Sequence, residues 1–188
     1  MAEFPPFVSA FGERAPLRRE FAGLRVEEIA RPGIAAIAAR KDQDAALADA
    51  LSRGFALAPP HAGQCAHANK ITLIAAGPSA FLAFKPEAGY AFASECAQAL
   101  QAHASVADQS SAYCWLRLSG PRARETLQKA VFLDLSAEAF APGAAAISVM
   151  AHIGAVLWRE SADECYDLAA FRSYAFDLLH MLEIIAQS

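Results

Sequence analysis

Three potential metal ligands lie close together in one proline-rich loop. His61, Cys65 and His67 follow the run Ala58-Pro59-Pro60. Thiolate and imidazole groups suit zinc, but a structural zinc site needs about four ligands, which usually come as closely spaced pairs. The spacing is compatible with a partial zinc site or with a solvated loop. We predict the solvated loop and no metal site in this chain.

The other three histidines each lie within an apolar stretch of the sequence. They are His103, His152 and His180. Buried polar groups are usually hydrogen-bonded. We therefore expect these three histidines to have hydrogen-bond partners in the core or in an interface.

Carboxylates are the remaining candidates for acid–base chemistry. Asp108 is expected at a strand edge, where an aspartate commonly holds backbone N–H groups in an Asx-type turn. Asp163, Glu164 and Asp167 bracket an expected hairpin and are predicted to be solvated. No two of these residues form an acid–base pair that the spacing supports.

The motifs that mark common active sites are absent from the sequence. Its ten glycines are scattered, so no dinucleotide fingerprint or phosphate-binding loop is present. Neither HExxH nor Gly-x-Ser-x-Gly occurs. By motif alone, the chain specifies a scaffold without catalytic, cofactor-binding or metal-binding residues.

Aromatic residues with arginines nearby in the sequence indicate either an interface or a core. Trp, Tyr and Arg carry much of the energy of protein interfaces, whereas Trp is also common in cores. Both interpretations stay open for the following residues: Trp115, Trp158 and Tyr174, with Arg117, Arg159 and Arg172.

Composition describes the domain that must position these residues. The chain has 188 residues, and its 55% hydrophobic content includes 46 alanines, so small side chains dominate. Charged residues make up 19%, below the roughly 25% of typical soluble domains. This thin polar surface predicts a subunit with a covered face. The net charge of −4 argues against a nucleic-acid partner, which selects a basic surface.

Location follows from the chain start, the longest uncharged stretch and the cysteines. Residues 1–16 lack the basic head and apolar run of a signal peptide. Residues 139–158 carry no charge, but Pro142-Gly143 and polar residues interrupt them, which disfavours a membrane span. The four cysteines form no CxxC pair, and we expect reduced, mostly buried thiols in a cytoplasmic protein.

The first half of the chain alternates short strands and helices. Residues 1–20 form a polar lead, broken by Pro5-Pro6, that is expected to pack along the rest of the protein. Asp42-Gln43-Asp44 is a favourable helix start, because acidic groups face unpaired N–H groups. Strands are predicted over 24–29, 34–40, 71–75 and 80–84, and helices over 42–54 and 92–103.

The second half has the same order. Strands are predicted over 113–118, 146–150, 155–158 and 166–168. One helix is expected to begin at Gly120-Pro121, because proline loses no needed hydrogen bond at the first helical position. Another follows a Ser173 cap. Its predicted buried stripe consists of Tyr174, Leu178, Leu182 and Ile185.

Each half therefore has a strand, a helix, a strand pair and a helix. The helices align weakly, Leu47 with Leu127 and Leu100 with Leu182. This pattern favours a single α+β domain over residues 1–188 with pseudo-duplicated, ferredoxin-like halves at about 22–104 and 105–188. Chance similarity among alanine-rich helices is the alternative.

Runs of the second half resemble a known family. They are 106–110 (VADQS), 116–124 (LRLSGPRAR), 133–135 (LDL), 140–144 (FAPGA), 157–159 (LWR), 166–168 (YDL) and 172–175 (RSYA). In the first half, 77–82 (GPSAFL) is similar to the family's Gly-Pro-x-x-Trp-Leu turn, with Phe81 in place of tryptophan. Together these runs resemble the gamma subunit of heterotetrameric sarcosine oxidase.

The resemblance implies a fold, an activity and partners. The fold is that of the folate-binding aminomethyltransferase group. The complex oxidatively demethylates sarcosine to glycine, hydrogen peroxide and methylenetetrahydrofolate. The gamma subunit is a cofactor-free partner packed on the alpha subunit, with beta and delta completing the complex. FAD, FMN, NAD and tetrahydrofolate are expected on the partner subunits.

The resemblance also bears on catalysis. Aminomethyltransferases place an acidic pair after a glycine-rich strand start, whereas the matching run 154–158 (GAVLW) has no carboxylate. Without an anion, a cationic one-carbon centre is not stabilised there. We expect an accessory subunit. The alternatives are a free-standing folate-binding or one-carbon transfer protein, and a structural module that pairs with another amine dehydrogenase.

Overall fold

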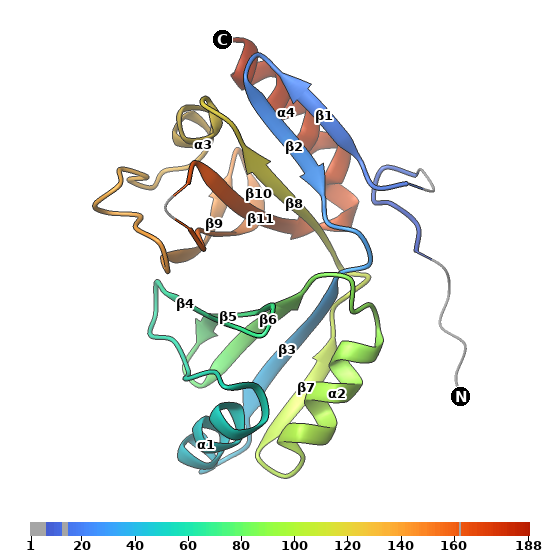
Figure 1. Cartoon of the computed structure of the whole chain (residues 1–188), viewed down its shortest axis with the longest axis vertical. Coiled ribbons are helices and arrows are strands. Elements are labelled where there is room, and N and C mark those ends of the chain that lie inside the picture. Colours follow the sequence, from blue (N-terminus) through green and yellow to red (C-terminus); the bar gives the residue numbers. More distant parts are fainter. Residues whose placement is uncertain (1–6, 13–14, 162) are drawn as a thin grey trace. The chain divides into compact units, whose positions relative to one another are not determined.

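Two compact units make up the chain. The computed structural model describes residues 7–12, 15–161 and 163–188. In the described part of the chain, the first unit is Arg31–Ser111, and the second combines the residues before Arg31 with Ala112–Ser188. Figure 1 shows that each unit contains a sheet and helices. The mixed α and β character predicted from the sequence is confirmed.

The first unit has a five-stranded sheet in the order β4-β5-β6-β3-β7. All of its pairings are antiparallel. Its elements are β3 (Gly33–Ala39), α1 (Asp44–Phe55), β4 (Cys65–Ala68), β5 (Ile71–Gly77), β6 (Ala80–Lys85), α2 (Ala91–Leu100) and β7 (Ala104–Asp108).

The second unit has a six-stranded sheet in the order β1-β2-β8-β11-β10-β9, again antiparallel throughout. A short 3-10 helix, η1, precedes its last helix. The elements are β1 (Arg18–Phe21), β2 (Leu24–Glu28), β8 (Tyr113–Ser119), α3 (Ala123–Ala130), β9 (Ala145–Met150), β10 (Ile153–Trp158), β11 (Cys165–Phe171), η1 (Arg172–Tyr174) and α4 (Ala175–Gln187).

The two units repeat one arrangement. The order β3-α1-β4-β5-β6-α2 recurs as β8-α3-β9-β10-β11-α4, and the strand orders of the two sheets correspond. Without the extra edge strands, each sheet has the antiparallel ferredoxin-like order. The aligned leucines of the sequence lie on corresponding helices, Leu47 on α1 and Leu127 on α3. The predicted pseudo-duplicated architecture is therefore confirmed.

The strand that completes each sheet has a different origin in the two units. In the first unit, β7 follows α2 and pairs with β3. In the second unit, β2 pairs with β8, in the register Val26↔Leu118, although it precedes the whole first unit in the chain. The first half predicted from the sequence, about 22–104, includes residues 24–29, whereas the structure places them in the second sheet. Their pairing is non-local, and no local pattern encodes it.

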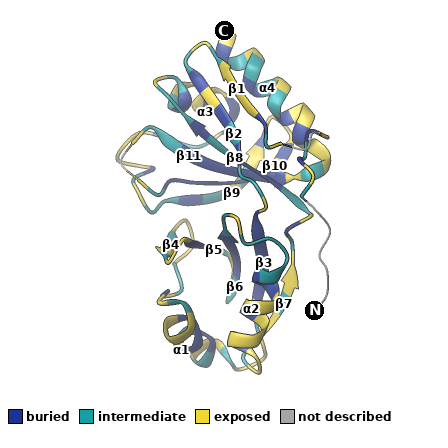
Figure 2. Cartoon of the chain, turned by 45° about the vertical axis from the view of Figure 1, so that its right-hand side comes forward, coloured by how far each residue is buried: buried dark blue, intermediate teal, exposed yellow. Residues whose placement is uncertain are grey.

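Each sheet buries one face under its two helices. In the second unit this core combines side chains of α3 and α4 with alternate residues of the strands, and Leu127, Leu182, Leu116 and Leu168 are all fully buried. In the first unit α1 and α2 contribute in the same way. Figure 2 shows the buried strands in dark blue. Successive strand residues point to opposite faces of the sheet. The residues between these core positions therefore lie on the face away from the helices, which carries the candidate site.

One glycine is required where β8 ends. Gly120 has φ +104°, and an added Cβ would lie 2.5 Å from the carbonyl oxygen of Gly23. The chain approaches the β1–β2 turn there, and only a residue without a side chain allows that distance. The neighbouring Pro121 precedes α3, which begins at Ala123, two residues later than predicted.

Other element ends differ slightly from the predictions. The helix expected over 92–103 ends at Leu100, because Gln101 leaves the helical region with φ 28°. Ser173 lies inside η1 and does not cap α4, whose N-terminal flanking residue is Tyr174. Tyr174 is exposed, so it is not part of the buried stripe, whereas Leu178 and Leu182 are. Strands β1 and β4 were not expected.

The described residues of the lead pack along the second unit, as predicted. Glu28 is buried and accepts hydrogen bonds from Ser9 Oγ at 2.5 Å, from the Ala10 N–H at 2.7 Å and from the Leu17 N–H at 3.0 Å. The carboxylate therefore replaces water for the backbone of this segment. The expected break at Pro5-Pro6 lies outside the described residues.

In the described part of the chain, no helix is long and apolar enough to cross a bilayer.

Candidate functional site

Strand register brings charged side chains into one row across the second sheet. Successive side chains of β8 point to opposite faces of the sheet. Leu116 therefore lies in the helix-covered core, and Trp115 and Arg117 lie on the opposite face. The row runs through the paired residues Arg18, Glu27, Arg117, Asp167, Trp158 and Ala145. Four successive charges alternate in sign, which favours this register.

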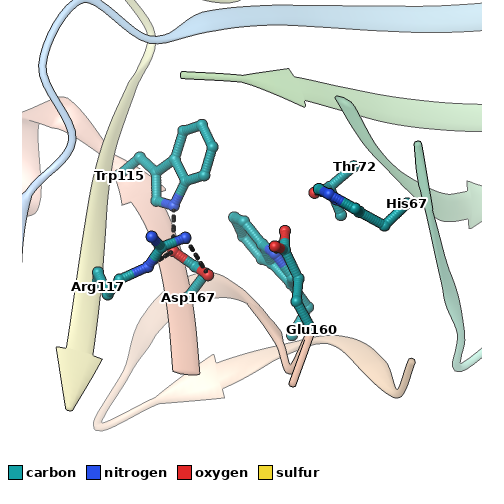
Figure 3. Close-up of polar contacts among 7 residues, drawn as sticks. His67, Thr72, Trp115, Arg117, Glu160 and Asp167 are labelled. Atoms are coloured by element: carbon teal, nitrogen blue, oxygen red, sulfur yellow. Dashed lines mark hydrogen bonds and ion pairs between the residues drawn. The ribbon is translucent and has the colours of Figure 1, made fainter. Parts of the chain in front are cut away.

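The middle of the row is an ion pair with a buried carboxylate. Asp167 is 2% exposed, and Arg117 reaches it with two hydrogen bonds, Nε to Oδ1 at 3.1 Å and Nη2 to Oδ2 at 2.9 Å. Trp115 donates a third from Nε1 to Oδ1 at 2.8 Å. Figure 3 shows both donors converging on the carboxylate. The bidentate geometry is the strong form of an arginine–carboxylate contact.

Opposing effects act on the pKa values of Asp167 and Arg117. Burial raises the pKa of Asp167, while the hydrogen bonds and the charge of Arg117 act in the opposite direction. Burial alone lowers the pKa of Arg117, but its hydrogen bond and attraction to Asp167 raise it overall. The pair is thus a charged unit whose stability depends on both partners. Asp167 was predicted to be solvated, and this prediction is wrong.

Two tryptophans pack beside the pair. The rings of Trp115 and Trp158 lie with centroids 5.5 Å apart, and both side chains are buried. Trp158 donates from Nε1 to Glu160 Oε1 at 3.2 Å. Of the two interpretations left open by the sequence, the core is correct for both tryptophans. Arg159 is also buried, and its Nη1 donates a hydrogen bond to the carbonyl oxygen of Phe140 at 3.1 Å.

The arrangement braces the sheet and offers little for chemistry. Three hydrogen bonds from cationic or indole donors occupy the Asp167 carboxylate, so its oxygens are already engaged within the protein. The glycine-led run 154–158 forms most of β10, and it brings no carboxylate to this face. In the described residues, the site is a structural ion pair between two strands.

The three candidate zinc ligands do not share one loop, so the prediction of a solvated loop is correct for His61 and wrong for Cys65 and His67. Cys65 and His67 lie on β4, and His67 Nδ1 lies 3.1 Å from Thr72 Oγ1 on β5. His61 is an exposed residue of the preceding loop. Among the residues that the structure describes, no three potential ligands come together as a metal-holding group.

Of the other three histidines, His103 has the expected hydrogen-bond partner, whereas His152 and His180 lie outside the core. His103 follows α2 in a turn and is half-buried, with Nδ1 2.9 Å from Gln43 Oε1. His152 and His180 are exposed, so the core position is wrong for them, and the interface position stays a prediction. His152 lies in the two-residue β9–β10 turn with φ 75°, and His180 lies on the outer side of α4.

Two of the predicted carboxylate roles hold. Asp108 Oδ1 accepts from the Ser110 N–H at 2.9 Å, which is the predicted Asx-type turn. Asp163 is exposed as expected. Glu164 is half-buried and pairs with Arg124.

The cysteines agree with reduced thiols. All four are free, with Cys96 and Cys114 buried and Cys65 and Cys165 half-buried. Burial raises the pKa of Cys96 to about 12, and it also raises the pKa of Cys114. These thiols are packing residues, because a thiol with a raised pKa is a weak nucleophile.

Exposed apolar side chains are concentrated in the second unit. Among the described residues these are Val8, Phe132, Ile147, Val149, Phe171, Tyr174, Phe176 and Ile184. Of the aromatic residues singled out in the sequence, only Tyr174 belongs to this set. The signal that could have found the others is α4 itself, because Phe176 and Ile184 lie outside the stripe of Leu178 and Leu182.

Comparison with solved structures identifies the fold. A chain of the heterotetrameric sarcosine oxidase from Corynebacterium sp. U-96, in complex with pyrrole 2-carboxylate, superposes with a TM-score of 0.76 at 23% identity, covering 89% of this chain and 86% of that one. The glycine cleavage system aminomethyltransferase T from Bartonella henselae gives 0.60 at 16% identity, covering 89% and 53%. The aminomethyltransferase-like fold predicted from the sequence is confirmed.

Sequence comparison gives the family. The gamma subunit of sarcosine oxidase from Arthrobacter sp. is 37% identical over 126 residues, and that from Corynebacterium sp. strain P-1 is 36% identical over the same length. Each alignment covers 66% of this chain and 60% of the relative, so the match spans about three fifths of those proteins. The model of the "Sarcosine oxidase, gamma subunit family" matches residues 40–186. The chain belongs to the sarcosine oxidase gamma subunit family.

Proposed function

We propose that this chain is the non-catalytic gamma subunit of a heterotetrameric sarcosine oxidase. The observation that carries the proposal is the family match over residues 40–186. Both curated relatives are gamma subunits of sarcosine oxidase. The role is assembly of a complex that converts sarcosine to glycine, hydrogen peroxide and methylenetetrahydrofolate.

The proposed partners carry the chemistry. The alpha subunit contacts this chain directly, beta and delta complete the complex, and FAD, FMN, NAD and tetrahydrofolate belong to these partners. The complex is cytoplasmic. Side chains of this chain support a role without catalysis, because the buried Asp167 is committed to Arg117 and Trp115. The residues of β10 offer no anion for a folate amine, so this chain does not fit a folate-dependent step.

Co-expression tests the proposal. The chain is produced alone and together with the alpha, beta and delta subunits, and each preparation is assayed for sarcosine-dependent peroxide. We expect the chain to co-purify with the flavin-bearing subunits, and only the complex to be active. Sarcosine turnover by the chain alone would overturn the non-catalytic role. Co-purification with a different amine dehydrogenase would overturn the choice of complex.

A free-standing folate-binding protein is the second candidate, because the chain shares its fold with an aminomethyltransferase. Titration of the isolated chain with tetrahydrofolate separates the two. Submicromolar affinity would support the second candidate, and no saturable binding would support the accessory subunit.

A further inference from the structure

One apolar surface of the second unit extends along α4. Its exposed members, which we call the α4 patch, are Val8, Phe171, Tyr174, Phe176 and Ile184. They come from the N-terminal segment, the end of β11, η1 and α4. Figure 2 shows exposed residues along α4 in yellow. Exposed aromatic groups gathered in this way are typical of protein interfaces.

The patch is held together by contacts between its segments. The Phe176 ring packs edge-on against Phe11, with centroids 5.5 Å apart. Arg172 of η1 donates from Nη2 to the carbonyl oxygens of Val8 at 2.6 Å and Ser9 at 2.7 Å. Glu28 fixes the same segment from the other side. The patch is therefore a built surface, with its N-terminal part tied to η1 and α4.

Helix α4 has an apolar inner side and an outer side that mixes large apolar residues with polar ones. Its inner residues, among them Leu178 and Leu182, are buried in the core of the unit. On its outer side, Phe176, His180 and Ile184 follow at intervals of four residues, with Phe176 63% and Ile184 55% exposed. Large apolar side chains exposed together on one side of a helix are a common feature of protein interfaces. Phe176 and Ile184 thus fit a covered position.

Charges around the patch identify the kind of partner. Residues 175–187 contain Asp177 and Glu183 but no lysine or arginine. The nearby cations are Arg172, which donates to the Val8 and Ser9 carbonyls, Arg122, which pairs with Glu125, and Arg19 of β1, whose cross-strand partner Val26 lies in the helix-covered core. The charged groups of α4 itself are therefore acidic, and they lie beside the apolar members of the patch.

A second copy of this chain fits poorly. If two α4 helices pack antiparallel about a twofold axis at His180, Phe176 meets Ile184 of the other copy, but Asp177 meets Glu183. Like charges placed opposite each other in an interface are unfavourable. A different protein with basic residues in those positions has no such repulsion.

We propose that the α4 patch is the docking surface for another subunit of the complex, whose facing surface is apolar and carries lysine or arginine opposite Asp177 and Glu183. The proposal rests on the proposed function and adds the face and the chemistry of the contact. It requires that the wild-type chain is a monomer on its own and that the patch becomes inaccessible in the complex.

Matched surface variants test the proposal in the co-expressed complex. Phe176→Ser combined with Ile184→Ser should lower the association constant at least about tenfold, because buried apolar anchors dominate interfaces. The control is Phe132→Ser combined with Val149→Ser, two exposed apolar residues of the same unit. It should stay within about twofold of the wild type, as expected away from an interface core. Circular dichroism checks that both variants are folded.

The charge of the partner is tested separately. Asp177→Lys should weaken assembly, and more at low salt than at high salt, because screening reduces charge contacts. Asp49→Lys, at an exposed position of α1, is the control and should have no effect.

The outcomes separate the two proposals. If the wild-type chain does not assemble with the other subunits, the proposed function fails, and the docking surface fails with it. If the wild type assembles and the α4 variants assemble equally well, only the docking surface is overturned. A wild-type dimer that the α4 variants convert to a monomer would assign the patch to a second copy and overturn the proposal.

Discussion

At the residue scale, the ion pair of Arg117 and Asp167 is asymmetric. The Asp167 side chain is 3% exposed and that of Arg117 is 38% exposed, so only the arginine keeps access to water. Removing the arginine leaves a buried unpaired carboxylate, whereas removing the aspartate leaves a cation that water can still solvate. Arg117→Leu should therefore lower the free energy of unfolding by about 3–5 kcal/mol, and Asp167→Leu by clearly less. Urea denaturation of the two variants measures the difference.

The same variant has a predicted pH dependence. Burial raises the pKa of Asp167, so the folded state binds a proton more readily than the unfolded state does. In the Arg117→Leu variant, the positive charge that opposes this rise in the pKa of Asp167 is missing. The destabilisation of Arg117→Leu should therefore shrink as the pH falls and the carboxylate becomes protonated. An equal loss of stability at mildly acidic and at alkaline pH would contradict a buried, unpaired Asp167.

The surface carboxylate of Glu125 has a pKa shift opposite in direction to that of Asp167. Hydrogen bonds from Arg122 and Lys129 lower the pKa of Glu125 on α3 to about 2. A lowered pKa means that the stabilisation is present above the ordinary pKa of 4.5 and is lost as the pH falls toward 2. Glu125→Gln should accordingly lower the Tm at neutral pH and have no effect near pH 2. Thermal scans of both proteins over this range check the prediction, with Glu138→Gln as an exposed control.

At the element scale, the close approach of Gly120 to Gly23 is the most sensitive backbone contact. A Cβ at position 120 would meet the Gly23 carbonyl oxygen at 2.5 Å, and the residue has a positive φ. Gly120→Ala is therefore expected to cost at least about 1–3 kcal/mol, because it adds backbone strain to a steric clash. Gly63→Ala is the control, since it has a similar positive φ but open space around its Cβ. Equal effects of both substitutions would show that the contact is unimportant.

The elements also show what local sequence can predict. The hairpin β5–β6 was predicted because the turn residues Gly77-Pro78 lie directly between its strands. The prediction for Asp167 failed for a different reason. Its alternation with Tyr166 and Leu168 indicates correctly that it faces away from the helices, but the assumption that this face is solvated was wrong. Burial of a sheet face is decided by the rest of the molecule.

Trp158 illustrates the same limit. The sequence is compatible with Trp158 as an interface residue or as a core residue, because tryptophan is common in both places. In the structure it is fully buried beside Trp115. Its partner in the row, Asp167, lies nine residues away on a different strand, and Arg117 is farther still. Strand register creates the candidate site, and register is not visible in periodicity.

At the scale of the whole molecule, the origin of β2 decides which part of the chain can fold. The second unit needs β2 beside β8, because Leu24 and Val26 complete its core and are fully buried. Residues 112–188 alone lack this strand and leave the edge of β8 unpaired. We expect that fragment to aggregate or to remain partly unfolded, as exposed apolar edge strands do.

Moving the missing strand should rescue the fragment. In the first unit, β7 follows α2 directly and occupies the place in the sheet that β2 has in the second. A permuted chain in which residues 15–30 follow residue 188 through a flexible linker reproduces that order. We expect it to show dispersed amide resonances and cooperative unfolding, unlike 112–188 alone. The matched control carries Val26→Asp in the added strand and should fail, because the aspartate would enter the core. A folded 112–188 fragment without the added strand would show that the duplicated order of elements is sufficient, and that β2 is an accessory edge.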